Sequence, residues 1–222
     1  MDMDRMVGFG GKQAWLAIRD GNPAEVLEAL GLRDLGETPW REGIDMAHLS
    51  DDRVAITPPL AGARGETWVL AAGRFLQRPD VVVDVTALSK QLRTEVQLFE
   101  THRVTELHRW QRAADGTLIR AFGYVGQTGD VTSWFGDPDV AERAVGLPAG
   151  ITRPEEQEPA ESIDAFDAEL AELLASESED DDEVSVLVSE HDVLQVADAW
   201  SLDPTRLDGH PAPGPLRIGA AG

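Results

Sequence analysis

The first half of the chain alternates apolar and polar positions in short runs, a pattern typical of strands separated by turns. Four such runs are expected to form strands: residues 13–19, 53–57, 67–72 and 81–85. Glycine, proline or aspartate stands next to most of these runs, and these residues commonly end strands. The pattern therefore predicts a sheet of short strands.

Helix signals stand between these runs. Asn22 followed by Pro23 predicts a helix with an asparagine cap and a first-turn proline, and Gly31 predicts its end. A second short helix is expected over residues 86–93, with Thr86 as its N-cap.

The clearest local signal is a hairpin in the middle of the chain. Residues 95–112 form one long run rich in Val, Thr, Phe and Trp, and residues 117–126 form a second alternating run. An Asp-Gly pair lies between them, which is the strongest short-range signal for a two-residue hairpin turn. In that register Trp110 faces Ala121, so large residues of one strand meet small residues of the other.

The C-terminal third changes in character. A Pro- and Glu-rich stretch is expected to be a linker, and an amphipathic acidic helix is expected to begin at Ser162. Ser189 and Asp192 match a capping box and predict a last helix that docks on the body through Trp200. The predicted organisation is an α+β globular domain over residues 12–150, an acidic linker with an amphipathic helix over 151–188, a C-terminal helix over 189–206 and a disordered tail over 207–222.

The order of these elements favours one fold class. Hairpins mixed with helices indicate an α+β fold with an antiparallel-rich mixed sheet, helices packed on one face, and C-terminal helices. A doubly wound nucleotide-binding fold fits less well, because the strands do not regularly alternate with long helices.

Charge is distributed unevenly along the chain, whose net charge is −22. Residues 154–205 contain 18 acidic residues and no Lys or Arg, whereas residues 1–153 contain 22 acidic and 17 basic residues. Such a field repels nucleic-acid phosphates and anionic membranes, so neither is expected as a partner. It attracts basic proteins and speeds their association.

The compartment is expected to be the cytoplasm. The chain has no cysteine, which excludes disulfides and cysteine-based zinc sites. No apolar run approaches about 20 residues, and the first eleven residues lack the apolar stretch of a signal peptide. No motif indicates a cofactor, so none is expected.

The richest set of chemical groups lies in residues 100–108, ETHRVTELH. On an uninterrupted strand, residues two apart share a face, so one face is expected to carry Glu100, His102, Glu106 and His108. Imidazoles and carboxylates can bind a divalent metal or act as general acids and bases. The ends of the set are roughly 26 Å apart on a strand, so only neighbouring pairs could cooperate. The alternative is a partly exposed face whose carboxylates pair with Arg103 and Arg109.

Aromatic residues form a second candidate set. Trp40, Trp110, Tyr124 and Trp134 are candidates for a ligand pocket or an interface, although most tryptophans are expected in the core. Trp40 and Trp134 lie in segments that contain glycine and proline, which favours a position at the surface.

The acidic stretch is the third candidate. Apolar residues occupy one stripe of its predicted helix, acidic residues lie opposite, and the run SESEDDDE follows. The acidic interaction segment is assigned to Phe166, Leu170, Leu173, Asp180, Asp181 and Asp182.

Several strings of the sequence resemble one family. They are WLAI at 15–18, the helix at 23–32, TPP at 57–59, WVL at 68–70, EVQLF and THRV within 95–104, RAFGY at 120–124, and VADAWS with Asp203-Pro204 at 196–204. Together they are similar to a family of uncharacterised bacterial proteins that is frequent in actinobacteria, over most of residues 14–208. Relative to that pattern, residues 155–183 look like an expanded connection. The resemblance implies no activity and no catalytic residues.

Three functions remain open. The segregated charge and the lack of a complete catalytic constellation favour a non-catalytic protein-binding module with an acidic surface, similar to an immunity or inhibitor protein that holds a basic effector. One alternative is an enzyme or metal-binding protein that uses residues 100–108 as its site. The other is a small-ligand-sensing domain with an aromatic pocket near Trp110 and Tyr124.

Overall fold

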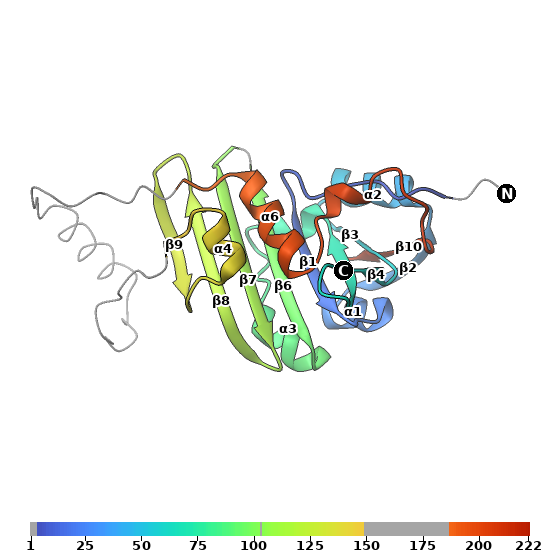
Figure 1. Cartoon of the computed structure of the whole chain (residues 1–222). Coiled ribbons are helices and arrows are strands. Elements are labelled where there is room, and N and C mark those ends of the chain that lie inside the picture. The colour runs from blue at the N-terminus through green and yellow to red at the C-terminus, as the bar shows by residue number, and fades with distance from the viewer. Residues whose placement is uncertain (1–3, 103, 149–186) are drawn as a thin grey trace, which may run out of the picture.

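The computed structural model describes residues 4–102, 104–148 and 187–222. Within these ranges ten strands form one sheet in the order β2-β10-β3-β5-β1-β6-β7-β8-β9, and β4 pairs with β5 beside this path (Figure 1). Every one of these strand pairs is antiparallel. The α+β prediction is confirmed as an antiparallel sheet with several helices, without the parallel pairs that a mixed sheet contains.

The elements follow the chain in this order. The strands are β1 (Ala14–Arg19), β2 (Arg33–Thr38), β3 (Arg53–Ile56), β4 (Leu60–Ala61), β5 (Thr67–Ala72), β6 (Glu95–His102), β7 (Leu107–Ala114), β8 (Thr117–Val125), β9 (Asp130–Phe135) and β10 (Leu216–Ala220). The helices are α1 (Pro23–Ala29), α2 (Trp40–Leu49), α3 (Val85–Leu92), α4 (Val140–Ala144) and α6 (Glu190–Trp200). Two short 3₁₀ helices are η1 (Arg74–Gln77) and η2 (Pro204–Leu207).

The sheet carries apolar side chains on both faces, because successive strand residues point to opposite sides. In β1, Trp15 and Ala17 belong to one buried cluster, and Leu16 and Ile18 belong to another. Residues of α2, α4 and α6 pack in the first cluster, on the side we call face 1. Residues of α1, α3 and η1 pack in the second, on face 2. The prediction that the helices pack on one face is therefore not confirmed.

The run at 95–112, which we expect to form one strand, is two strands. β6 and β7 pair antiparallel, and a turn that ends at Glu106 joins them. Glu106 has a φ of 50°, in the left-handed region that a chain reversal often requires. The sequence concealed this turn because its residues include Val104 and Thr105, which are common in strands.

The next hairpin has the predicted turn but a different register. The Asp-Gly pair at 115–116 connects β7 to β8 with positive φ at both residues. A register shift beside Ala113 then moves the pairing by one residue, so Trp110 faces Phe122 and not Ala121. Their ring centroids lie 4.5 Å apart. The predicted pairing of large with small residues is wrong here, because a bulge places two aromatic rings in contact.

The C-terminal residues belong to the sheet. β10 lies between β2 and β3 and pairs with both. Leu216, Ile218 and Ala220 are buried, so an alternating pattern of only five residues completes the structure. The predicted disordered tail over residues 207–222 is wrong, and the domain predicted to end at residue 150 lacks a strand of its own sheet.

The helix signals that fall on described residues are confirmed, except that the second helix has a different N-cap. The Asn22 side chain accepts a hydrogen bond from the Ala24 backbone N–H and caps α1. Residues 81–85 form no strand, and Asp84 instead of Thr86 caps α3, with its carboxylate accepting two backbone N–H groups at 2.9 Å. The last residue of the β-branched run at 81–85, Val85, is instead the first residue of α3, where it is buried.

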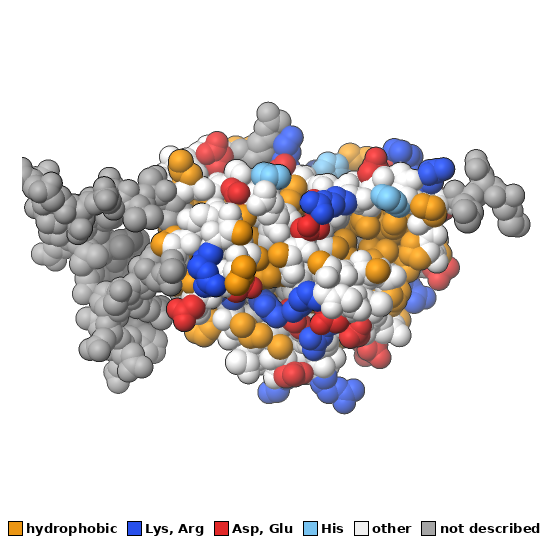
Figure 2. All heavy atoms as spheres, in the orientation of Figure 1, with side chains coloured by type: hydrophobic (Ala, Val, Ile, Leu, Met, Phe, Trp, Pro, Cys, Tyr) orange, Lys and Arg blue, Asp and Glu red, His pale blue; other side chains and the backbone are white. Residues whose placement is uncertain are grey.

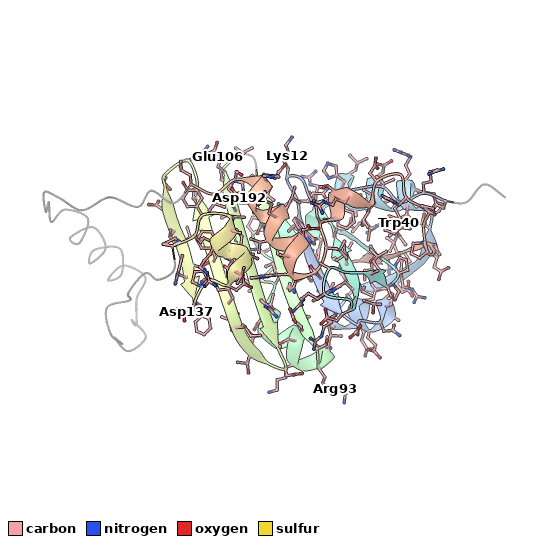
Figure 3. All side chains as sticks on the ribbon, viewed as in Figure 1. Lys12, Trp40, Arg93, Glu106, Asp137 and Asp192 are labelled. Carbon is pink, nitrogen blue, oxygen red and sulfur yellow. The ribbon has the colours of Figure 1, made fainter. Side chains whose placement is uncertain are left out.

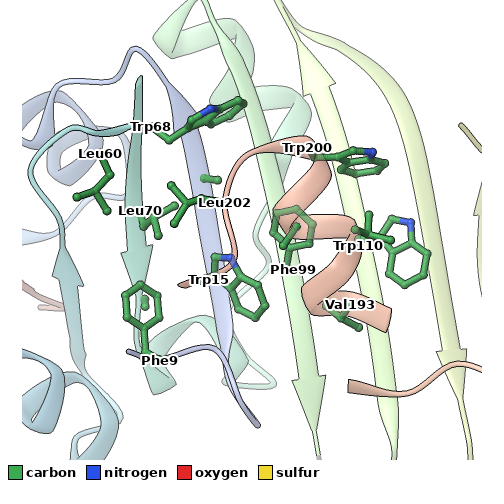
Figure 4. Close-up of a cluster of buried hydrophobic side chains, with 14 of the residues drawn as sticks. Phe9, Trp15, Leu60, Trp68, Leu70, Phe99, Trp110, Val193, Trp200 and Leu202 are labelled. Atoms are coloured by element: carbon green, nitrogen blue, oxygen red, sulfur yellow. The ribbon is translucent and has the colours of Figure 1, made fainter. Parts of the chain in front are cut away.

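The last helix docks on the body as predicted. The Asp192 carboxylate accepts hydrogen bonds from the Ser189 backbone N–H at 2.8 Å and the Ser189 hydroxyl at 2.7 Å, which caps α6. Figure 4 shows Val193 and Trp200 of α6 beside Phe99 in the face 1 core, where the Trp200 and Phe99 ring centroids are 6.0 Å apart. The amphipathic helix predicted from residue 162 lies outside the described residues.

Candidate functional site

A polar pocket of about 400 Å³ lies where the start of α6 meets the ends of β6 and β7. We call it the His108 pocket. It is lined by Lys12, Thr101, Glu106, His108, Val188, Ser189 and Glu190. Figure 3 shows Lys12, Glu106 and Asp192 together at this upper edge of the sheet. The lining comes from three stretches that are far apart in the sequence.

The pairing of β6 with β7 places two of these residues side by side. Thr101 faces His108 across the ladder, just as Phe99 faces Trp110 two residues further on. Phe99 and Trp110 are both in the face 1 core, so the period of two puts Thr101 and His108 on face 1 as well. Burial of Phe99 and Trp110 in the apolar core therefore determines that the Thr101 and His108 side chains point to face 1, where the pocket lies.

The first residue of α6 closes the pocket. One carboxylate oxygen of Glu190, Oε2, accepts hydrogen bonds from the Lys12 backbone N–H at 2.8 Å and the Thr101 hydroxyl at 2.7 Å. Lys12 has a φ of 58°, so two of the five non-glycine residues with positive φ in the described ranges, Lys12 and Glu106, line this pocket. Such backbone strain is often concentrated at functional sites.

His108 is the most enclosed ionisable group of the pocket. Only 7% of its surface is exposed, and Nδ1 is buried with no hydrogen-bond partner among the described residues. Burial lowers the pKa of His108 below 6.5, although the carboxylates of Glu190, Glu106 and Asp192 act in the opposite direction. The imidazole is therefore neutral at pH 7 and offers one acceptor and one donor nitrogen.

The pocket is negatively charged. Glu106, Glu190 and Asp192 form no ion pair with a Lys or Arg within the described ranges. Among the described residues of the lining, Lys12 is the one Lys or Arg, and it is exposed. With His108 neutral, the carboxylates outnumber the cations in this described part of the pocket.

The buried carboxylates elsewhere are neutralised. Glu142 is completely buried, and its Oε1 accepts hydrogen bonds from the Arg120 guanidinium at 2.7 Å and the Trp110 indole N–H at 2.6 Å. Glu95 is 2% exposed and lies 2.9 Å from Arg64 and 2.7 Å from Arg112. Figure 2 shows acidic and basic side chains next to one another across the lower middle of this side of the molecule. These two buried carboxylates are therefore paired within the fold.

The four polar residues expected on one face of residues 100–108 do not converge. The turn reverses the chain, so Glu100 and His102 lie on face 2, whereas His108 lies on face 1. Glu100 is 5% exposed and pairs with Arg109, as the alternative interpretation predicted. His102 contacts the Thr105 hydroxyl at 3.1 Å. Among the residues that the structure describes, no group of three His, Asp or Glu is placed to hold a metal ion.

The aromatic candidates lie mainly in the core. Trp110 is fully buried and Tyr124 is 2% exposed, and neither lines the His108 pocket. The surface position predicted for Trp40 is wrong: it is 0% exposed, and its indole N–H donates to the Gly214 carbonyl oxygen at 2.8 Å. Trp40 begins α2, whose apolar side packs on face 1. Trp134 is partly buried, with its ring edge against Phe122.

A larger hollow of about 600 Å³ lies beside the N-terminal residues of the described chain. Asp4 and Arg5 line it together with the end of β2, Pro39, Ala212, Gly214 and Pro215. The Asp4 carboxylate accepts the Trp40 backbone N–H at 2.9 Å and so caps α2, whose N-cap residue Pro39 has no polar side chain. This carboxylate therefore has a structural role.

Sequence reasoning found two pocket residues, Glu106 and His108, and missed the others. Ser189 was identified only as a helix cap, and no local pattern indicates that Lys12 meets Glu190 across 178 residues. The acidic interaction segment assigned to Phe166, Leu170, Leu173, Asp180, Asp181 and Asp182 lies outside the described residues.

Comparisons with protein-family models, with curated proteins and with solved structures found no match for this chain. Within the described residues, no helix has the length and apolar character needed to cross a membrane.

Proposed function

We propose that this protein is a non-catalytic binding module that holds a basic protein partner through its acidic surface, in the manner of an immunity or inhibitor protein. The observation that carries the proposal is the separation of charge: residues 154–205 contain 18 acidic residues and no Lys or Arg. Such a one-signed field steers basic partners and raises their association rate.

The described part of the chain supports this proposal through its own ion pairs. Arg64, Arg109, Arg112 and Arg120 are paired with buried carboxylates of the sheet and of α4. These cations are occupied within the body. In the sequence, the acidic run at 177–183 ends five residues before Val188, which lines the His108 pocket just ahead of α6.

The test compares two full-length proteins that differ only in charge. In the second, each Glu and Asp of residues 177–183 is replaced by Gln or Asn, so that length and polarity are kept. Both are used for capture from the native cell lysate at low salt and at about 0.5 M salt. We expect a basic protein retained by the first version at low salt and lost at high salt, because screening shortens the reach of exposed charges to a few ångströms. Equal retention by both versions would contradict the proposal.

Removal of the acidic segment should leave the fold intact. Leu147 and Val188, which flank the segment in the described chain, are both buried in the face 1 cluster, and α4 contacts α6. We expect deletion of residues 155–183 to keep a cooperative unfolding transition. The free energy of unfolding should rise by about 1 kcal/mol, because a shorter connection between Leu147 and Val188 costs less entropy to close. Urea denaturation followed by tryptophan fluorescence measures this, and a non-cooperative transition would show that the segment is part of the core.

A further inference from the structure

The His108 pocket presents hydrogen-bond acceptors that the fold does not use. Glu190 binds the Lys12 N–H and the Thr101 hydroxyl through Oε2 alone, and Oε1 makes no hydrogen bond to a described residue. The Glu106 carboxylate makes no hydrogen bond within the described ranges, and only the backbone carbonyl of Glu106 accepts, from the Gly126 N–H at 3.0 Å. The His108 imidazole also lines the pocket. Its Nδ1 is enclosed and has no hydrogen-bond partner among the described residues, so Nε2 is the nitrogen left to accept from a ligand. Buried polar groups of proteins are normally hydrogen-bonded, so an exception needs an explanation.

An anion does not fit these groups. Although α6 begins at the pocket, the Ser189 N–H at its start already donates to the Asp192 carboxylate. The surrounding charges of Glu106, Glu190 and Asp192 would repel a phosphate or a carboxylate. A metal ion does not fit either, since no three ligand groups of the described chain converge here.

A planar cation with several N–H groups does fit. Guanidinium has five donors, stays charged at all physiological pH values, and is more weakly hydrated than ammonium, so it loses less when it leaves water. The acceptors of the pocket are two carboxylates from different elements, Glu106 of the β6–β7 turn and Glu190 of α6, and the imidazole of His108 lines the same pocket. A volume of about 400 Å³ is large enough for an arginine side chain.

We propose that the His108 pocket binds the guanidinium group of an arginine side chain on the basic partner, with Glu106 and Glu190 as its carboxylate ligands and His108 as a hydrogen-bond acceptor. This inference rests on the proposed function for the source of the arginine. The site itself does not depend on the partner, so it can be tested with a small arginine compound.

The experiment uses the full-length, isotope-labelled protein at pH 7.5 and follows its ¹H–¹⁵N spectrum. Nα-acetyl-arginine amide is the probe, and the matching lysine and citrulline amides are added in parallel. Citrulline has the shape of arginine without its charge. We expect saturable shifts at the backbone amides of Lys12, Ser189 and Glu190 with the arginine compound, with a dissociation constant in the millimolar range typical of a single side chain. We expect no saturable shifts with citrulline and weaker binding of lysine.

Two variants test the carboxylates, and a third is the matched control. Glu190→Gln and Glu106→Gln each remove one charge, and each should weaken binding of the arginine compound roughly fivefold or more. Glu106 is exposed and its side chain has no partner in the described chain, so its replacement cannot act by unfolding the protein. Asp137→Asn removes one exposed charge near the opposite end of β9 from the pocket (Figure 3) and should leave binding unchanged.

The outcomes separate the site from the function. Equal shifts with citrulline, tighter binding of lysine, or unchanged affinity in both pocket variants would overturn the guanidinium assignment. If the acidic run captures a basic protein but the arginine compound does not bind, the inference fails and the proposed function stands. If the compound binds as expected but the acidic run captures nothing, the site stands and the proposed function fails.

Discussion

The two ends of the face 1 core surround their buried ionisable groups in opposite ways. At one end, Glu95 is almost completely buried and three arginines, Arg19, Arg64 and Arg112, lie within ion-pair distance of it. At the other end, His108 is almost as buried, but it has carboxylates around it and no hydrogen bond to a described residue. The first arrangement is complete by itself. The second is not complete among the described residues, and the proposed guanidinium site depends on this difference.

The two ends also shift pKa values by different causes. At Glu95 burial opposes ionisation, but the hydrogen bond from Gln97 and the charges of Arg112 and Arg64 outweigh it and hold the pKa below 4.5. At His108 burial is the dominant cause and holds the pKa below 6.5. Glu95 therefore remains charged because it is paired, and His108 remains neutral because it is enclosed.

The largest loss of stability is expected at the ion pair of Glu142 with Arg120, because both side chains are almost completely buried. Glu142→Ala would leave the Arg120 guanidinium and the Trp110 indole N–H buried without their acceptor. We expect a loss of about 3–5 kcal/mol in the free energy of unfolding, as for other buried ion pairs that lose one partner. Urea denaturation is the measurement, with Glu106→Ala as the control. A loss below about 1 kcal/mol would show that this pair is not enclosed as described.

A smaller effect is expected at Glu95. The arginines around it keep 21–37% of their side-chain surface in water, so they can be solvated when the carboxylate is removed. We expect Glu95→Ala to cost roughly 2–3 kcal/mol, less than Glu142→Ala. The same denaturation series compares the two variants, and the reverse order would contradict the difference in burial.

The pH dependence of stability should show the two ends in separate windows. His108 has a lowered pKa in the folded state, so the unfolded state binds its proton first, and stability falls as the pH drops from 6.5 toward the folded value. Glu95 also has a lowered pKa, so its contribution is present above pH 4.5 and is lost as the pH falls through the folded value. We expect His108→Gln to remove the first decline and Glu95→Gln the second. Melting temperatures between pH 8 and pH 3 measure both, and an unchanged first decline in His108→Gln would assign it to another group.

The smallest effect on stability is expected in the pocket itself. Glu190→Gln keeps an oxygen that can accept from the Lys12 N–H and the Thr101 hydroxyl and removes only the charge. We expect the free energy of unfolding to change by less than about 1 kcal/mol. A larger loss in urea denaturation would show that Glu190 serves mainly to attach α6.

Much of the local structure could be predicted from short patterns. Asn22 with Pro23 marked the start of α1, the Asp-Gly pair at 115–116 marked a hairpin turn, and the Ser189 capping box marked α6. Each of these features depends on neighbours within a few residues. The errors lie where a local pattern was ambiguous, as in the turn concealed within residues 95–112 and the short alternation of β10.

The candidate site was predicted only in part for the same reason. Glu106 and His108 were found because they stand close together in a polar run. Glu100 and His102 were grouped with them wrongly, because the turn sets a register in which Thr101 pairs with His108 and His102 with Leu107. Paired residues share a face, so His102 and His108 point to opposite faces of the sheet. The contact of Glu190 with Lys12 joins residues that are 178 positions apart, and no short pattern reports such a contact.

The sequence by itself determined the antiparallel α+β character, the separated acidic charge and the caps of several helices, since these follow from propensity, composition and neighbouring residues. Only the tertiary structure decided which carboxylates have an arginine partner and which have none among the described residues. Whether a buried charge has a partner depends on the strands and helices that pack around it. That packing placed arginines around Glu95 and Glu142, and placed α6 with its own carboxylates over His108.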